Sequence, residues 1–264
     1  MRESLVGSSL IDSAKRLPQW PPVRPWGELV IETGEVHVWR AALDVQASSF
    51  PRLWDTLDTV ERARAARFVF ERHRLRYVVA HGLLRHVLSG YLATTPEKLR
   101  FGRGRYGKPY LTATSGAALR FNLSHSRDRM LVAVGLGREL GVDLEYVRCD
   151  RDVAGIARHF FSTAEVSALL ALPVRERCAA FYRCWTRKEA YIKACGTGLA
   201  MRLDSFDVSL EPGARAALLR SERGHEEPQR WKLVELPVEE GFHATLAVEG
   251  DDWRVVANTL DSPG

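Results

Sequence analysis

The hydrophobic period of the chain switches several times along its length, and the order of these switches limits the fold more than any other feature. Short segments with apolar side chains at alternate positions, as in strands, flank two longer segments with the period of a helix, at 55–93 and 181–199. The order strands, long helix, strands therefore occurs in both halves, although no repeat is visible residue by residue. It predicts an α+β fold of two similar lobes, at 27–139 and 140–258.

The two ends of the chain fall outside this pattern. Residues 1–26 finish in "LPQWPPVRPWG", whose prolines disfavour helix and interrupt strand ladders, so we expect an N-terminal extension that runs over the surface. Residues 259–264 form a short tail. With 264 residues, 45% of them hydrophobic, the chain should be compact, and no stretch approaches the roughly 20 apolar residues of a membrane span. We expect a cytoplasmic protein.

Charge and cysteine content exclude few functions. The formal charge of +5 suits nucleic acid, a phosphate-rich ligand or an acidic protein partner, and does not choose among them. The four cysteines make no CxxC pair and have no histidine at finger spacing, so neither a zinc site nor a disulfide framework is favoured. We expect four reduced, mostly buried thiols, at Cys149, Cys178, Cys184 and Cys195.

Local signals predict several individual elements. "ELVIETGEVHVWRAALD" is typical of a hairpin around Thr33-Gly34, and the segment 55–93 is typical of one long helix. In the second half, Ser162 to Glu165 fits a capping box that opens a short helix, which Pro173 ends. The segments "FDVSL", "WKLVEL", "HATLAVEG" and "WRVVAN" are expected to be strands that close a second sheet.

Two carboxylates are expected to share one face of the strand "GVDLE". Alternation places Asp143 and Glu145 on one side of this strand and Val142 and Leu144 on the other. Like charges side by side need water or a cation between them, so the strand is either a solvated edge or part of a metal site. A third carboxylate from a nearby element would favour a hard ion such as Mg²⁺, and Glu189 is the candidate.

The segment "FYRCWTRKEAYIKACGTGL" predicts a helix that ends at Gly196 and Gly198. Spacing by four puts Trp185, Glu189 and Lys193 in one row, whereas Lys188 points elsewhere. A Glu and a Lys four residues apart are also the commonest surface ion pair of a helix. The row is therefore either an ordinary solvated face or a half-buried functional face, on which Lys193 would neutralise a phosphate.

Two further turns carry polar groups. "FNLSHS" offers Ser124, His125 and Ser126, whose hydroxyl, imidazole and backbone N–H groups suit an anion, although an ordinary serine-rich turn has the same residues. Adjacent Ser124 and His125 make poor triad geometry, so a hydrolase is not favoured. "RYGKPY" places Gly107 and Lys108 in a turn stiffened by Pro109, which is by itself a weak signal.

A basic run, "RARAARFVFERHRLR", lies within the helical segment of the first half. It contains arginines suited to gripping phosphate, at Arg64, Arg67, Arg72 and Arg76. A solvated helix face or nucleic-acid binding would also explain them. No nucleic-acid motif follows, and apolar side chains interrupt the run.

Six blocks, taken in order, resemble the 4'-phosphopantetheinyl transferases of the Sfp-like, surfactin-synthetase-activating class. They are "RFVFERHRLRYVVAHGLLR", "YGKP", "FNLSHS", "GVDLE", "FFSTAE" and "WTRKEAYIKACGTGL", and they span residues 67–199. The resemblance implies two pseudo-symmetric α+β halves in a monomer, with coenzyme A as co-substrate bound between them. It also implies transfer of the phosphopantetheine arm to a serine of a carrier protein, with release of adenosine 3',5'-bisphosphate and use of Mg²⁺.

The resemblance also implies roles for single residues. It makes Asp143, Glu145 and Glu189 the metal ligands, with Glu189 also a possible general base and Lys193 a catalytic residue. The positions that it implies for coenzyme A are Arg64 and Arg76 for the 3'-phosphate, Gly107, Lys108 and Pro109 for the adenine, and Ser124, His125, Lys188 and Lys193 for the phosphates. One position departs from the family, because Glu61 stands where some relatives have lysine.

The carrier protein is expected to be acidic, as an acyl or peptidyl carrier. Arg148, Arg151 and Arg158 follow the metal strand and are candidates for meeting it, with a solvated face as the alternative. Neither a membrane nor nucleic acid is an expected partner. Two rival functions keep some support: a coenzyme A or nucleotide sensor without turnover, which has no need of three carboxylates, and a nucleic-acid binder, which leaves "WTRKEAYIK" unexplained.

Overall fold

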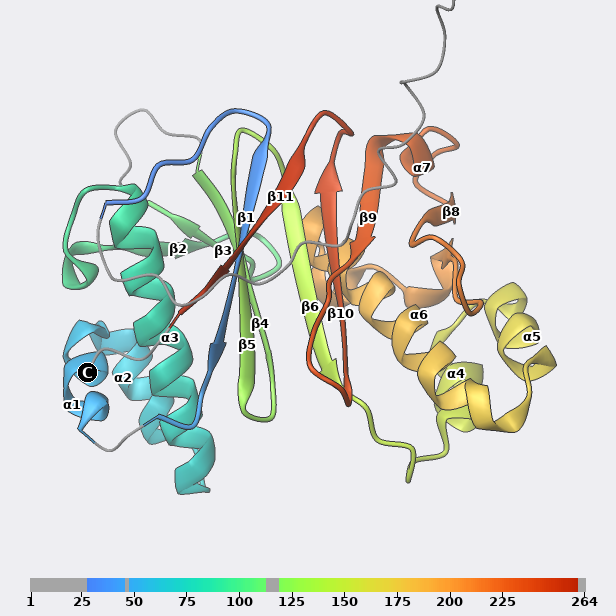
Figure 1. The fold of residues 1–264 in the computed structure, drawn as a ribbon, viewed down its shortest axis with the longest axis horizontal. Helices are drawn as coiled ribbons and strands as arrows, with labels where there is room; N and C mark the ends of the chain where they lie inside the picture. Colours follow the sequence, from blue (N-terminus) through green and yellow to red (C-terminus); the bar gives the residue numbers. More distant parts are fainter. Residues whose placement is uncertain (1–27, 46–47, 113–118, 261–264) are drawn as a thin grey trace, which may run out of the picture.

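The computed structural model describes residues 28–45, 48–112 and 119–260. Two lobes lie side by side, each with helices on its outer face, and their sheets meet in the middle of the molecule (Figure 1). The first sheet has the order β11-β1-β5-β4 and the second the order β6-β10-β9. The fold is therefore α+β, as the sequence predicts. The predicted N-terminal extension lies outside the described residues, as does most of the predicted C-terminal tail.

The larger elements have the following bounds. The first lobe contains β1 (Glu35–Ala42), α1 (Ser49–Thr56), α2 (Thr59–Ala66), α3 (Glu71–Tyr91), β4 (Leu119–Ser126) and β5 (Arg129–Leu136). The second contains β6 (Leu140–Tyr146), α4 (Val153–Phe160), α5 (Thr163–Ala171), α6 (Val174–Cys195), β9 (Trp231–Glu235) and β10 (Phe242–Glu249). Smaller pieces are β2 (Phe101–Arg103), β3 (Pro109–Leu111), β7 (Phe206–Val208), β8 (Leu218–Ser221) and α7 (Glu227–Arg230), and the last strand is β11 (Arg254–Thr259).

The segment 55–93 is three helices, not one, so that prediction is wrong. A capping box restarts the chain at α2, since Asp58 accepts from the backbone of Glu61 and the Glu61 side chain accepts from the backbone of Asp58. The apolar stripe of α3 is buried as predicted. At Gly82 a Cβ would lie 2.9 Å from the Cβ of Leu53, so glycine lets α1 pack directly on α3.

Three expected strand pairings are also wrong. Residues 28–32 are not a strand, so there is no hairpin at Thr33-Gly34; β1 pairs instead with β5 and β11. The segment "WRVVAN" does not close the second sheet, because β11 returns to the first lobe and runs parallel to β1. Likewise "FDVSL" forms β7, which pairs with β8 in a separate small sheet. The capping box of Ser162 and Glu165 is confirmed at α5.

The core consists of three apolar layers. One lies between α1–α3 and the first sheet, and another between α4–α6 and the second sheet. The third lies between the two sheets, where Val38 and Leu131 of the first meet Val142 and Leu246 of the second. Because side chains alternate along a strand, the opposite face of β6, which carries Asp143 and Glu145, is directed toward α6.

The expectation of four reduced cysteines is wrong for two of them. Cys149 and Cys178 form a disulfide with a Cα–Cα distance of 5.6 Å, whereas Cys184 and Cys195 are free. The pairing depends on how the chain after β6 folds back onto the start of α6. Spacing along the sequence does not reveal that approach.

None of the helices in the described part of the chain combines the length and the apolar character needed to span a membrane.

Candidate active site between β6 and α6

The site begins where α6 crosses β6 at very close range. A Cβ on Gly141 would lie 2.3 Å from the carbonyl oxygen of Ala190, so only glycine allows this approach. Asp143 and Glu145 follow on the same face of β6. The shared face is the one that the alternation in "GVDLE" predicts, and on it Asp143 is buried and Glu145 is half-buried.

The row predicted on α6 is a half-buried face. Trp185 stands at the N-terminal end of this row. The rings of Phe160, Phe161 and Phe181 pack around it. One and two turns further on, Glu189 and Lys193 are both half-buried. The Nζ of Lys193 donates to Asp143 Oδ1 at 2.6 Å and to Ser124 Oγ at 2.9 Å. The ion pair of Lys193 is therefore with the strand carboxylate and not with Glu189.

The carboxylates are electrostatically crowded. Desolvation raises the pKa of Glu145 to about 7, and the charges of Asp143 and Glu189 contribute to this rise. Desolvation and the charge of Asp143 also raise the pKa of Glu189. A cation close to all three groups would relieve this crowding. In this structure the ammonium of Lys193 provides the positive charge at Asp143.

The donor set fits a hard divalent cation in its chemistry. All three side chains offer oxygen ligands, and Asp143 Oδ2 is buried without a hydrogen-bond partner. In the described ranges, however, no group of three or more His, Cys, Asp and Glu side chains is arranged as a ready-made metal site. The roles of these three residues as metal ligands stay a prediction.

A cavity of about 650 Å³ adjoins Glu189 and Lys193. Its walls include the predicted turn residues Gly107, Lys108 and Pro109. Gly107 has φ +89°, as the tight turn requires, and Lys108 Nζ donates to Glu139 and to two backbone carbonyls. Sequence reasoning missed the apolar half of this cavity, at Phe160, Ile192, Met201 and Leu203. No local pattern marks these residues, because they come from separate elements.

Lys188 does not belong to the site, which corrects its predicted contact with phosphate. Its side chain is fully buried and forms an ion pair with Glu165 at 2.8 Å. It also donates to the backbone carbonyls of Leu203 and Phe206. Because these partners hold its ammonium in the protein interior, and Lys188 is not among the residues that line the cavity, Lys188 has a structural role.

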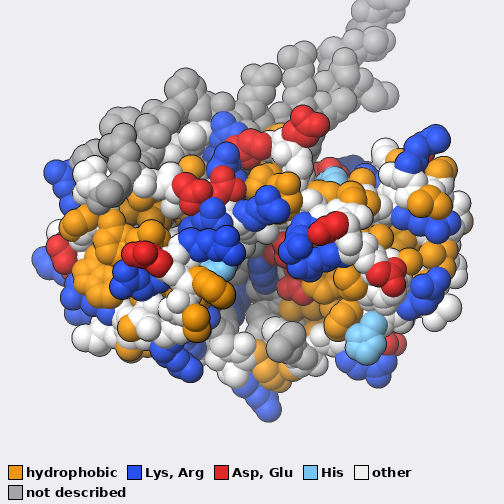
Figure 2. All heavy atoms as spheres, turned by 90° about the horizontal axis from the view of Figure 1, so that it is seen from below, with side chains coloured by type: hydrophobic (Ala, Val, Ile, Leu, Met, Phe, Trp, Pro, Cys, Tyr) orange, Lys and Arg blue, Asp and Glu red, His pale blue; other side chains and the backbone are white. Residues whose placement is uncertain are grey.

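His125, Arg64 and Arg76 lie on the first-lobe side of the site. Desolvation lowers the pKa of His125, and nearby positive charges lower it further. Those charges come from His81, Lys193, Arg64 and Arg76. Figure 2 shows the molecule from below, where the surface is hollowed between the lobes and Lys and Arg side chains gather around the hollow. Such a surface suits an anion with several charges.

Both Arg76 and Arg64 already contact other side chains. Arg76 binds Asp44 through two hydrogen bonds of 2.9 and 3.0 Å. The guanidinium of Arg64 lies 5.7 Å from the ring centre of Tyr77. Arg64 also lines a shallow hollow together with Arg67 and Arg103.

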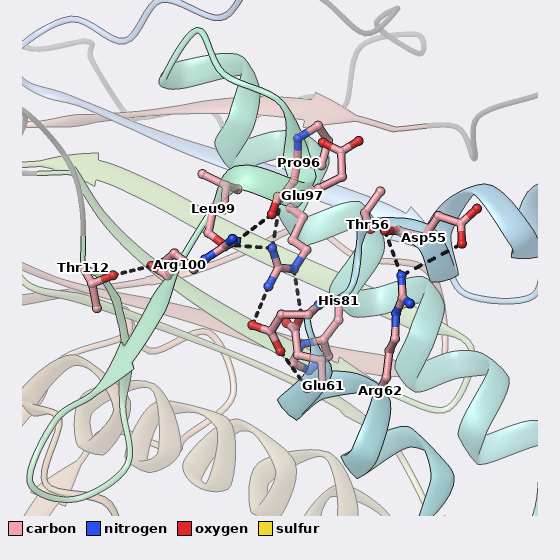
Figure 3. A network of polar contacts seen from close by, with 12 residues as sticks. Asp55, Thr56, Glu61, Arg62, His81, Pro96, Glu97, Leu99, Arg100 and Thr112 are labelled. Carbon is pink, nitrogen blue, oxygen red and sulfur yellow. Dashed lines mark hydrogen bonds and ion pairs between the residues drawn. The ribbon is translucent and has the colours of Figure 1, made fainter.

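Glu61 is not a free negative charge near this surface. Its carboxylate accepts from Arg85 at 2.7 Å and lies 3.0 Å from His81 Nδ1. Figure 3 shows Glu61 and His81 turned toward one another within a network that continues to Pro96 and Leu99. Glu61 therefore supports the packing of α2 on α3.

The arginines that follow β6 are exposed, and two of them border a second cavity. Arg148 and Arg151 line this cavity of about 280 Å³, which also includes Glu145 and Trp185. Arg158 is exposed on α4 outside it. The disulfide at Cys149 joins this loop to α6.

The comparisons with known proteins indicate one family over most of the chain. Residues 139–247 match the profile of the 4'-phosphopantetheinyl transferase superfamily, and residues 42–136 match that of the 4'-phosphopantetheinyl transferase N-terminal region. The chain is 39% identical over 238 residues to 4'-phosphopantetheinyl transferase HetI of Nostoc sp. strain PCC 7120, covering 89% of this chain and 95% of that protein. It is 30% identical over 182 residues to a 4'-phosphopantetheinyl transferase of Bacillus subtilis, covering 69% and 79%. To Sfp of Bacillus subtilis strain 168 it is 31% identical over 167 residues, covering 63% and 72%. The chain belongs to the 4'-phosphopantetheinyl transferase superfamily.

Proposed function

We propose that this protein transfers the 4'-phosphopantetheine arm of coenzyme A to a serine of an acyl or peptidyl carrier protein and releases adenosine 3',5'-bisphosphate. The observation that carries the proposal is the convergence of Asp143, Glu145 and Glu189 with Lys193 beside a cavity large enough for part of coenzyme A. A sensor of coenzyme A would need the basic positions and the cavity. It would have no need of three crowded carboxylates.

Each residue of the proposed site has a separate role in phosphoryl transfer. Asp143, Glu145 and Glu189 would hold Mg²⁺, which supplies charge neutralisation at the pyrophosphate. Lys193 binds Asp143 at the edge of this group, and its positive charge would stabilise the negative charge that develops on the leaving phosphate. Glu189 is half-buried with a raised pKa, which suits a group that accepts the proton of the incoming serine hydroxyl.

Coenzyme A would lie between the lobes. The turn of Gly107, Lys108 and Pro109 forms one wall of the cavity and is the proposed adenine contact. Ser124 and His125 would hold the phosphates, and Arg64 and Arg76 the 3'-phosphate. The hollow rimmed by Lys and Arg in Figure 2 supports this placement, since coenzyme A carries several negative charges.

The carrier protein would approach beside Glu145. Exposed Arg148 and Arg151 border the cavity there, and Arg158 lies on the neighbouring helix. These charges suit an acidic partner.

Coenzyme A and carrier proteins are cytoplasmic substrates, which favours a cytoplasmic enzyme. A site built from both lobes of one chain is consistent with a monomer.

Mass spectrometry of an apo carrier protein tests the proposal. The carrier is incubated with this protein, coenzyme A and Mg²⁺, and a mass gain equal to the phosphopantetheine arm is the expected result. The matched control is a carrier whose acceptor serine is replaced by alanine, which should gain nothing. Binding of coenzyme A without any mass gain across fatty-acid, polyketide and peptide-synthetase carriers would favour the sensor instead.

A further inference from the structure

The two sheets are joined along β4 and β6 by side chains and not by a backbone ladder. Each of these strands is the edge of its own sheet, and they lie next to one another in Figure 1. Three backbone N–H groups of β6 donate to three alternate side chains of β4. The pairs are Val142 N to Asn122 Oδ1 at 2.9 Å, Leu144 N to Ser124 Oγ at 3.2 Å, and Tyr146 N to Ser126 Oγ at 3.0 Å.

The two serines of this seam also donate to the carboxylates of β6. Ser124 Oγ lies 3.1 Å from Asp143 Oδ1, and Ser126 Oγ lies 3.1 Å from Glu145 Oε2. A hydroxyl has one hydrogen and two lone pairs. When the N–H of Tyr146 occupies a lone pair of Ser126, the remaining hydrogen is directed at Glu145. Each serine therefore fixes both the register of β6 and the orientation of a carboxylate.

The two carboxylates differ in how many groups hold them. Asp143 is bound by Ser124 and also by Lys193. Glu145, in contrast, accepts a side-chain hydrogen bond from Ser126 alone among the described residues. Removal of the Ser126 hydroxyl would leave Glu145 free to change rotamer, whereas Asp143 would keep Lys193.

We propose that Ser126 is a positioning residue for the metal site, holding Glu145 in its ligating orientation across the seam between the lobes. This inference rests on the proposed function, because it takes Glu145 to be a metal ligand. Partners that orient a ligand commonly change metal affinity by about 10 to 100-fold when they are lost. The Ser126 hydroxyl contacts Glu145 and the backbone of Tyr146, so the effect of its loss should fall on the metal site.

The test is a titration with Mn²⁺, followed by the electron paramagnetic resonance of the free ion, with coenzyme A present and no carrier protein. Ser126→Ala should raise the Kd for Mn²⁺ by at least about 10-fold. Ser126→Thr keeps the hydroxyl and should stay within about threefold of the wild type. Ser167→Ala is the matched control, since the Ser167 hydroxyl donates to the backbone of Thr163 on α5 and should not affect the metal.

Three results would overturn the inference. One is an unchanged Kd in Ser126→Ala, and another is an equal loss in the Ala and Thr variants, which would indicate packing and not the hydroxyl. If Ser126→Ala does not fold by circular dichroism, Ser126→Cys takes its place, because a thiol has similar shape but donates weakly and should still raise the Kd. The third is a wild type that transfers the arm without binding Mn²⁺, which leaves the transferase function standing. A wild type that binds Mn²⁺ but never modifies a carrier refutes the proposed function instead.

Discussion

At the scale of single residues, substitutions of Glu189 and Lys193 test whether their row on α6 is part of an active site or an ordinary helix surface. Glu189→Gln keeps the shape but removes a charged oxygen ligand and a proton acceptor, so we expect the transfer rate to collapse, with partial rescue by Mg²⁺ only if ligation is its main role. Lys193→Gln removes the charge beside Asp143 and should slow transfer by about 10² to 10³-fold with near-normal metal dependence. Steady-state kinetics across a Mg²⁺ titration measures both.

The control for this pair lies on the same helix. Glu176 forms an exposed pair with Arg175 in the first turn of α6, and Glu176→Gln should keep the wild-type rate. Near wild-type rates in Glu189→Gln and Lys193→Gln as well would show that the row is only surface.

Arg76 gives a second residue-scale prediction, about the 3'-phosphate of coenzyme A. Arg76→Ala should weaken coenzyme A by about 10 to 100-fold, as expected for loss of a charge-assisted contact, and should weaken dephospho-coenzyme A much less. Isothermal calorimetry with both ligands measures the difference. Arg74→Ala, which removes an exposed partner of Glu71 on the same helix, is the control. Equal weakening of the two ligands would refute the contact, and Asp44 would then be the only role of Arg76 that the structure supports.

At the scale of elements, Glu61 holds α2 against α3. Desolvation would raise the pKa of Glu61, but the hydrogen bond from His81 and the charge of Arg85 outweigh it, so the pKa is lowered. A lowered carboxyl pKa contributes stability above the pKa of the unfolded chain, and this stability is lost as pH falls through the folded value. Glu61→Gln weakens one of the two ion pairs of buried Arg85 and leaves the pair with Asp58, so it should cost about 1.5 to 3 kcal/mol in the free energy of unfolding at pH 7.

Urea denaturation at several pH values measures this cost. The difference between wild type and Glu61→Gln should begin to shrink as pH drops below about 4.5, where Glu61 of the unfolded chain takes up a proton, and should become small as pH falls through the lower pKa of the folded state. A difference that stays constant from pH 7 to the acid range would mean that the charge of Glu61 does not stabilise the helix pair.

The elements also show which parts of the fold the sequence predicts. The capping box of α5 and the paired carboxylates of β6 depend on residues within one turn or one strand, so their patterns are visible locally. The return of β11 to β1 joins residues more than 200 positions apart, and no local pattern encodes it. The serine seam is an intermediate case, since "FNLSHS" shows the alternation of polar groups but not the strand that they meet.

The disulfide connects two elements and predicts a measurable stability difference. Cys149 and Cys178 close a loop with a sequence separation of 29. Loop-closure entropy gives about 3 to 4 kcal/mol for such a crosslink. Cys178→Ser should lose about this much free energy of unfolding under oxidising conditions, whereas Cys195→Ser, which changes a free thiol, should lose far less. Dithiothreitol should bring the wild type down to the level of Cys178→Ser; no effect of the reductant would show that the bond contributes nothing.

At the scale of the whole molecule, the apolar layer between the two sheets should make both lobes unfold together. Leu246 of β10 is fully buried in this layer, where it packs with residues of the first sheet and not with the helices of its own lobe. The last strand of the chain also belongs to the first sheet, so the first lobe lacks a strand unless the end of the second half is in place. A substitution in this layer should therefore destabilise the outer helices of both lobes.

Leu246→Ala tests this coupling, with an expected cost of about 2 to 5 kcal/mol from lost burial and the cavity left behind. Native-state hydrogen exchange measures the most protected amides of α3 in the first lobe and of α6 in the second. If the lobes form one cooperative unit, both helices should lose protection by the same free energy. A loss confined to α6 would show that the second lobe opens alone. Coenzyme A held between the lobes would then close two independent halves, and the site would form only in the bound state.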